Sequence, residues 1–253
     1  MSPVPKELAV FKKFDFERSP VGVKFHNIKP VGLKRPDKQY DFCEMLVEAQ
    51  KGKAFYVTKD DFTCIGPMLL GMVDALPDFE SGRVGPKLGV YRDERANRRM
   101  YLYLPKLAKG SVNYVSFAPL EKLTFEPDIL IVLANPSQTE IIIRALSYTT
   151  GETWSGRGTA AAGCSFLYLY ALVHGEMNII PTGVGFGMRS RRLFPEGMSL
   201  ITIPWDKLHQ IVGSLEEMEW VPESFTLGAE GHKKKVSRII EEIKKEKQAS
   251  GGD

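Results

Sequence analysis

Apolar residues recur along the chain at two periods, and these predict strands and helices in turn. Val21, Val23 and Phe25 alternate with small or charged residues, which predicts a half-buried strand. The run from Pro127 to Ala134 is apolar almost throughout, so we expect a central strand that is covered on both faces. Further strands are expected over residues 54–58, 100–104, 112–117 and 200–203.

Helices are predicted where apolar residues recur every three or four positions after a turn or capping residue. Asp41 is a candidate N-cap, with Glu44 three residues later, and Gly52 would end that helix. The segment 164–174 is apolar nearly all round, which indicates a buried helix. An amphipathic helix over 231–247 would either dock on the body of the protein or serve self-association. Other helices are expected over residues 64–72, 136–148 and 205–212.

Two stretches of the chain share a series of landmarks. Each contains a cysteine, an apolar helical run, a glycine, a strand-like run and a Thr-x-x-Gly segment, in that order. These landmarks are Cys43, Gly52 and Thr63-Cys64-Ile65-Gly66 in the first stretch, and Cys164, Gly175 and Thr182-Gly183-Val184-Gly185 in the second. We therefore expect an α+β or mixed α/β fold, with one globular domain over 7–215 made of two pseudo-symmetric halves. The helix at 231–247 and a disordered tail at 248–253 would follow it.

Composition restricts the class of protein. The 253 residues are 43% hydrophobic and 26% charged, as in ordinary globular proteins, and the net charge is only +3. No apolar run approaches the roughly 18 residues that span a membrane, and the N-terminus lacks the apolar core of a secretory signal. We expect a cytoplasmic protein with no membrane partner. The arginine-rich segment 92–99 contains its own acids and no aromatic platform, so a nucleic-acid partner is not expected either. Abundant Lys, Glu and Arg with few Asn and Gln is a bias found in hyperthermophile proteins.

The chain has three cysteines, Cys43, Cys64 and Cys164, and the pattern places each at or just before a helix start. Free backbone N–H groups and the helix dipole stabilise a thiolate there. Amide hydrogen bonds also tune metal clusters. In the apparent repeat, three of four equivalent positions carry a thiol and Gly183 is the fourth, which favours a three-thiolate site with one open position. No Cys-x-x-Cys is present, so only the fold can assemble such a site.

Other uses of these residues stay open. Zinc held by three cysteines and a histidine is one, and His174 is the nearest histidine to Cys164 in the predicted helix. A redox disulfide between Cys43 and Cys64 is another. Free cysteines also serve as small buried hydrophobic residues.

Glycine-rich loops provide a separate candidate for ligand binding. A glycine-rich turn that leads into a helix is in principle an anion site, although neither loop here matches a dinucleotide or Walker pattern. A close-packed loop is the alternative. The candidate residues for such a site are Gly156, Arg157, Gly158, Gly163, Gly183 and Arg189.

Short motifs in a fixed order give the chain a recognisable relative. They are Ser19-Pro20-Val21-Gly22-Val23-Lys24-Phe25, Phe42-Cys43 through Ala49 and Gly52, Thr63-Cys64-Ile65-Gly66 with Gly71, Pro127-Asp128-Ile129-Leu130, and Gly163-Cys164. From about residue 7 to about 215 the chain resembles the uncharacterised ArCR family, domain of unknown function family 169. The resemblance implies an archaeal or anaerobic bacterial origin, which is compatible with an oxygen-sensitive cluster, and it implies no reaction.

We expect a cytoplasmic metal-site protein in which Cys43, Cys64 and Cys164 hold an iron–sulfur cluster for electron transfer or ligand activation. Its partner would be a small molecule or a redox protein. The alternatives are a protein that binds an anionic small molecule or nucleotide, with structural cysteines, and a thiol redox protein. The sequence identifies no catalytic residue and leaves open whether the protein is an enzyme.

Overall fold

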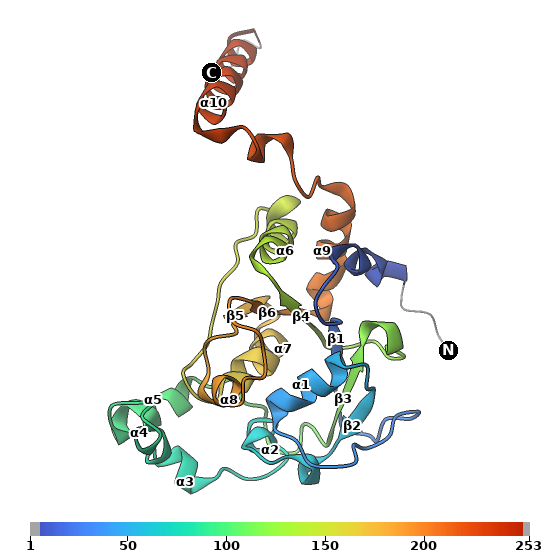
Figure 1. Cartoon of the computed structure of the whole chain (residues 1–253), viewed down its shortest axis with the longest axis vertical. Coiled ribbons are helices and arrows are strands. Elements are labelled where there is room, and N and C mark those ends of the chain that lie inside the picture. The colour runs from blue at the N-terminus through green and yellow to red at the C-terminus, as the bar shows by residue number, and fades with distance from the viewer. Residues whose placement is uncertain (1–5, 250–253) are drawn as a thin grey trace. The chain divides into compact units, whose positions relative to one another are not determined.

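A computed structural model describes residues 6–249, and the chain divides into two units, Met1–Glu216 and Glu217–Asp253. The first unit is built on a six-stranded antiparallel sheet with strand order β2-β3-β1-β4-β6-β5 (Figure 1). Its strands are β1 (Val21–His26), β2 (Phe55–Val57), β3 (Tyr114–Pro119), β4 (Ile129–Ala134), β5 (Asn178–Pro181) and β6 (Ser199–Pro204). The predicted mixed α/β class is confirmed.

Helical segments connect these strands. The α-helices of the first unit are α1 (Phe42–Gln50), α2 (Gly66–Leu69), α3 (Pro77–Glu80), α4 (Val84–Lys87), α5 (Glu94–Tyr103), α6 (Pro136–Tyr148), α7 (Ala171–His174) and α8 (Phe186–Ser190), with α9 (Trp205–Glu217) at its end. The 3-10 turns are η1 (Lys6–Phe14), η2 (Lys59–Asp61) and η3 (Leu120–Lys122), and η4 (Ser165–Tyr170) is a π-helix.

The second unit contains η5 (Glu223–Phe225) and the long α10 (Gly228–Ala249). The amphipathic helix expected over 231–247 therefore extends further at both ends. Of the disordered tail expected from residue 248, the first two residues belong to α10, and 250–253 lie outside the described residues. Among residues 6–249, no helix combines the length and apolar character needed to cross a bilayer.

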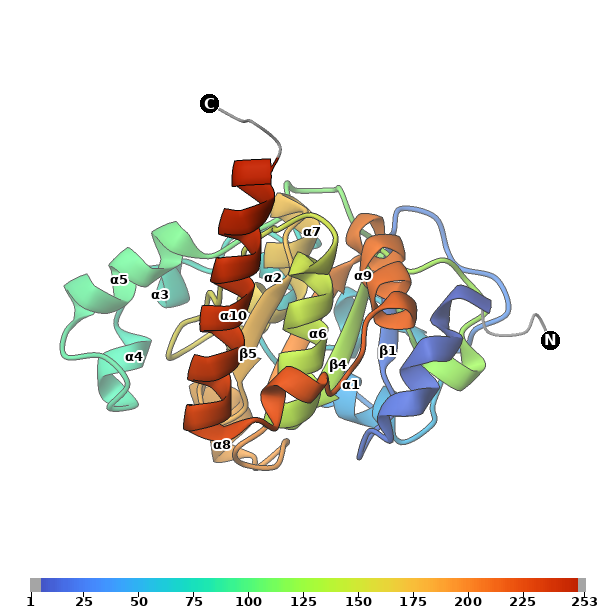
Figure 2. The same cartoon turned by 90° about the horizontal axis from the view of Figure 1, so that it is seen from above.

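Helices cover both faces of the sheet because its central strand is apolar on both. Every residue of β4 is buried, as the sequence predicted. Alternate β4 residues such as Ile129 and Ile131 join a cluster with α1 and η4 on one face. On the other face lie α6, α9 and η1, and both views show these three on the same side of the sheet (Figures 1 and 2). The Gln138 side chain ties α6 to η1 by donating to the Phe14 carbonyl at 2.8 Å.

The strand registers reveal two halves with the same topology. In the first, β1, β2 and β3 lie in the order β2-β3-β1, and in the second, β4, β5 and β6 lie in the order β4-β6-β5. The end of β3 pairs Pro119 with Val21, and the end of β6 pairs Pro204 with Ile129. Between the halves, β1 pairs with β4 in a register that is unchanged when the two halves are exchanged. The repeat inferred from the cysteine and glycine landmarks thus corresponds to a pseudo-twofold arrangement.

The halves differ in the helix that covers the face of the sheet on which α1 and η4 lie. The π-helix η4 takes the place of the regular helix α1, and the distance in sequence from cysteine to glycine is longer in the second half. Buried polar side chains of the sheet support η4: Asn178 donates to the Phe166 carbonyl at 2.9 Å and Thr202 donates to the Leu167 carbonyl at 2.6 Å. In the first half the equivalent strand pair is apolar, and its two rings stack with centroids 5.3 Å apart. That pair is Phe55 and Phe117.

Residues 100–104, expected as a strand, instead end helix α5. The side chain of Asp93 caps this helix by accepting from the Ala96 amide at 2.9 Å. The buried residues are Asn97, Met100, Tyr101 and Leu104, which recur at helical spacing, whereas Leu102 is 81% exposed. The apolar residues at positions 100, 102 and 104 alternate as in a strand. The Asp93 cap and the helical spacing of the buried residues nevertheless favour a helix.

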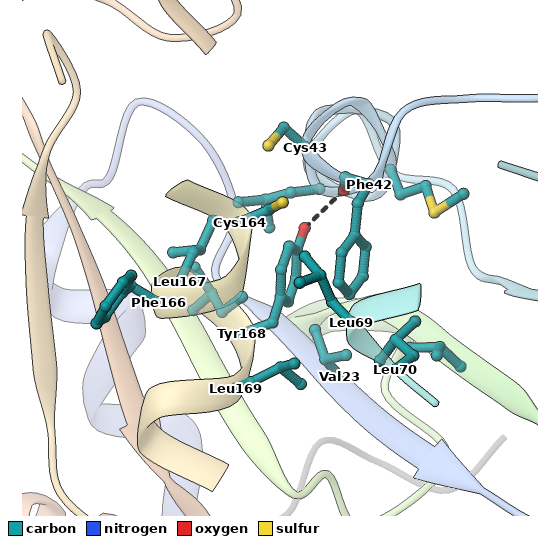
Figure 3. Packing of buried hydrophobic residues seen from close by; sticks show 14 of the residues in the cluster. Val23, Phe42, Cys43, Leu69, Leu70, Cys164, Phe166, Leu167, Tyr168 and Leu169 are labelled. Atoms are coloured by element: carbon teal, nitrogen blue, oxygen red, sulfur yellow. Dashed lines mark hydrogen bonds between the residues drawn. The ribbon is translucent and has the colours of Figure 1, made fainter. Parts of the chain in front are cut away.

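The two halves meet where Tyr168 of η4 packs on Phe42 of α1. The rings are stacked with centroids 3.9 Å apart, and the Tyr168 hydroxyl donates to the Phe42 carbonyl at 2.9 Å (Figure 3). Burial, and then the nearby cysteines, raise the pKa of Tyr168 well above its ordinary value. The phenol therefore stays protonated and keeps its donor role.

Replacing Tyr168 with Phe should lower the free energy of unfolding by about 1 kcal/mol, because the buried carbonyl loses a partner. Tyr170→Phe is the matched control, since its hydroxyl bonds to Glu176 on the surface and its loss should fall within about 0.5 kcal/mol of wild type. Denaturant unfolding of the two variants measures both. Equal losses would mean that the buried hydrogen bond contributes nothing specific.

Candidate functional site

Cys43, Cys64 and Cys164 line one cavity of about 280 Å³. Cys43 is the second residue of α1, Cys64 lies in the turn before α2, and Cys164 caps the N-terminus of η4. Cys43 and Cys164 are buried and Cys64 is partly exposed. Figure 3 shows the Cys43 and Cys164 side chains between α1 and η4. The fold thus brings together three residues that are far apart in the sequence, one from each of three helix starts.

Backbone amides surround the Cys64 sulfur. Its Sγ accepts from the Phe42 amide at 3.3 Å and from the Gly66 amide at 3.4 Å. Both amides belong to the first positions of helices, where N–H groups have no partner within the helix. They lower the pKa of Cys64, although burial, the largest effect, raises it to about 12.

Cys43 and Cys164 occupy equivalent positions in the two halves and interact directly. The pKa of Cys43 is well above its ordinary value, first because of its hydrogen bond with the Cys164 thiol and then because of burial and the neighbouring Cys164, Cys64 and Asp41. The closest thiol interaction is therefore between Cys43 and Cys164, which lie in different halves. The redox disulfide considered from the sequence was instead between Cys43 and Cys64, which both belong to the first half. With their raised pKa values, the metal-free Cys43 and Cys64 thiols stay protonated at neutral pH, whereas an activated nucleophile would be a thiolate.

An ion pair between a buried carboxylate and a partly exposed arginine lines the cavity. Asp41, only 3% exposed, forms a salt bridge with Arg191 and accepts from the Thr63 hydroxyl at 2.6 Å. Arg191 also donates to the carbonyl of Gly187, a residue of α8, at 3.1 Å. The sequence pattern identified Asp41 only as a helix cap and did not single out Arg191. Their pairing depends on the approach of α8 to the start of α1, which no local pattern encodes.

The rest of the lining is largely apolar and includes one buried amide. Its apolar residues include Ile65, Phe79, Val84, Leu88, Phe186 and Met188. Asn97 of α5 also lines the cavity, is 1% exposed, and has an Nδ2 with no hydrogen-bond partner among residues 6–249. In the sequence this residue falls in the arginine-rich segment 92–99, where the helix α5 that positions it was not predicted. The Asp93 cap and the spacing of Asn97, Met100 and Tyr101 are the signal that could have found it.

The glycine-rich residues proposed for anion binding lie in different places. Gly163 lines the cysteine cavity, and Gly158 lines a separate groove beside Arg95 and Arg99 of α5. The Arg157 backbone is fixed by Asn178, which accepts from its amide at 2.8 Å and donates to its carbonyl at 3.0 Å. A Cβ on Gly156 would lie 3.0 Å from the Ile179 carbonyl oxygen, so this glycine permits the loop to approach β5. The loop is therefore packed against the second half of the sheet.

Gly183, expected beside the open position of the site, lines a third pocket together with Arg189. In its place Gly185, which has a φ of +95° before α8, lines the cysteine cavity. His174 is exposed at the end of α7, where its ring lies 4.5 Å from that of Tyr170, and it does not line this cavity.

The segment that leads into Cys164 has unusual backbone geometry. Ala162 has a φ of +53°, which disfavours any residue with a Cβ, and the π-helix begins three residues later. Both features are enriched at functional sites. Among residues 6–249, no three His, Cys, Asp or Glu side chains stand close enough to bind one metal ion as they are placed.

The fold and the site define a class of protein: a mixed α/β protein with an antiparallel sheet and three thiols in one cavity. The chain belongs to the uncharacterised ArCR family, domain of unknown function 169, whose model matches residues 11–214. It is similar to an uncharacterised protein of the archaeon Methanocaldococcus jannaschii, with 23% identity over 195 residues that cover 76% of this chain and 83% of that protein. No solved structure matches it significantly. The resemblance seen in the sequence motifs is confirmed.

In the metal-free protein, alkylation of Cys64 by iodoacetamide should keep accelerating above about pH 9, because only the thiolate reacts and its pKa lies near 12. In denatured protein, the alkylation rate of the same thiol should level off above its ordinary pKa of 9.0. The raised pKa also stabilises the folded state fully below pH 9.0, and this contribution is lost as the pH rises towards 12. Peptide mass spectrometry gives the rate for each cysteine. A plateau near pH 9 in the folded protein would contradict the effect of burial.

Proposed function

We propose that the cavity is a metal centre in which Cys43, Cys64 and Cys164 hold an iron–sulfur cluster. The observation that carries the proposal is that all three cysteines of the chain, from three separate helix starts, line one cavity. Free cysteines that served only as small hydrophobic residues would have no reason to gather at one point in the fold.

The chemistry of the donors fits a cluster better than a single ion. In a four-iron cluster each thiolate binds a different iron, so the sulfurs need not converge on one point as they do around zinc. The three cysteines line the cavity, but among the described residues no three ligands converge on one metal ion, and a cluster does not need them to. Zinc with His174 as fourth ligand has less support, because that histidine lies on the exposed end of α7.

Backbone amides near Cys64 would stabilise a cluster-bound thiolate after the thiol has lost its proton. Amide donors from Phe42 and Gly66 to Cys64 are of the kind that stabilise cluster sulfurs and tune their potential. The raised pKa values of Cys43 and Cys64 mean that cluster binding must release protons, so loading becomes easier as the pH rises. With three protein ligands, such a cluster would supply either an electron or one open iron for a ligand.

Protein purified and reconstituted without oxygen should be brown and contain iron and sulfide in stoichiometric amounts. Replacing Cys43, Cys64 or Cys164 singly by Ser should each remove most of the bound iron, because each loss leaves two thiolates. Met188→Leu is the control, since Met188 lines the same cavity without being a proposed ligand, and it should retain the iron. Metal analysis and the visible absorption spectrum are the measurements.

Colourless protein without stoichiometric metal, after anaerobic reconstitution with iron and sulfide, would refute the proposal. The same holds if the serine variants keep their iron. Far-ultraviolet circular dichroism of each variant separates loss of metal from loss of fold.

A further inference from the structure

We infer that the apolar side of the cysteine cavity binds a small uncharged molecule whose one polar group is a carbonyl-type oxygen, recognised by Asn97. The inference deepens the proposed function, and it rests on that proposal only for what lies at the thiol end of the cavity. The ligand-binding end is formed by different residues and can be tested in protein without metal.

Charge in the lining excludes an ionic ligand. The charged residues that line the cavity are Asp41 and Arg191, which pair with each other, and Asp41 also accepts from Thr63. The pair therefore has no net charge with which to neutralise a carboxylate, phosphate or ammonium group. Placing an unpaired ion among the apolar side chains of this wall would carry a large desolvation cost.

The apolar wall fits a hydrocarbon body. Val84 and Leu88 of the α4 region, Phe79 of α3 and Phe186 of α8 line the cavity with apolar side chains. A cavity of about 280 Å³ lies near the lower limit of about 300 Å³ for ligand sites, so the ligand must be small.

Asn97 supplies a buried polar group of the lining that has no hydrogen-bond partner among the described residues. Its amide nitrogen has no partner among the described residues, although the residue is almost completely buried. Buried donors without partners are rare because each carries a desolvation penalty. Rotation about the last side-chain bond exchanges the amide N and O without a change of shape, so the nitrogen can face the cavity. A ligand oxygen there would satisfy it.

Gly85 fixes the position of this amide. A Cβ on Gly85 would lie 2.7 Å from the Asn97 Cγ, so only glycine allows the two segments to pack at this distance. Gly85 itself lines the cavity. The amide is thus held in place by its own packing, in the way a preorganised recognition group must be.

Two probes of equal shape test the inference in the metal-free protein: cyclohexanone, and methylenecyclohexane, which has CH₂ in place of the oxygen. We expect the ketone to bind about fivefold more tightly, which is typical of one uncharged hydrogen bond. Cyclohexanecarboxylate should not bind. NMR titration of the protein measures the affinities.

Asn97→Leu should remove the preference for the ketone while leaving both probes bound. Asn113→Leu, the same change at an exposed asparagine on the first-half side of the sheet, should leave the preference intact. If Asn97→Leu fails to fold, Leu88→Trp serves instead: Leu88 is 46% exposed and lines the cavity, and a bulky ring there should exclude both probes.

Several results would overturn the inference: equal affinity for ketone and alkene, no binding of either, tighter binding of the carboxylate, or unchanged binding in Leu88→Trp. Failure to load iron leaves this test unaffected, since no metal is present. Conversely, a loaded cluster in a protein that ignores the ketone refutes the inference and leaves the proposed metal centre intact.

Discussion

The contact between Phe42 and Tyr168 holds the candidate site together. These rings stack between α1 of the first half and η4 of the second, and the hydrogen bond from the Tyr168 hydroxyl to the Phe42 carbonyl closes the contact. Cys43 follows Phe42 directly, and Cys164 opens the π-helix that carries Tyr168. Any movement between the two helices would therefore separate the two thiols. Stability and the geometry of the candidate site depend on the same buried contact.

The site lies where a symmetric fold departs from its symmetry. Both halves use the same strand order, and both place a cysteine at the start of a helix on the same face of the sheet. The second half adds the π-helix, which Asn178 and Thr202 support from the sheet with polar side chains. Cys164 at the start of the irregular helix, the strained residue Ala162 before it and the ion pair of Asp41 and Arg191 all line one cavity. Departures from local rules of this kind are expected at functional sites, where the rest of the structure compensates for them.

Much of the fold was predictable because its signals are local. The strand β4 and the helices α1 and α6 follow from apolar runs and capping residues, and the repeat of cysteine and glycine landmarks indicated the two halves. The failure at residues 100–104 has a definite cause. Alternating apolar residues at the end of a short amphipathic helix imitate a strand, and the capping carboxylate of Asp93 decides in favour of the helix. Without helix α5, the sequence pattern did not single out Asn97, whose buried amide lines the cavity.

The sequence by itself determined the class of fold, the family and the placement of each cysteine at a helix start, since these depend on residues near one another in the chain. Only the tertiary structure decided that Cys43 faces Cys164, that Asp41 pairs with Arg191, and that Gly183 lies away from the cavity. Each of these depends on contacts between segments more than a hundred residues apart or on the exact course of a turn. The packing of helices across the pseudo-twofold arrangement sets them, and no local pattern of apolar and polar residues specifies that packing.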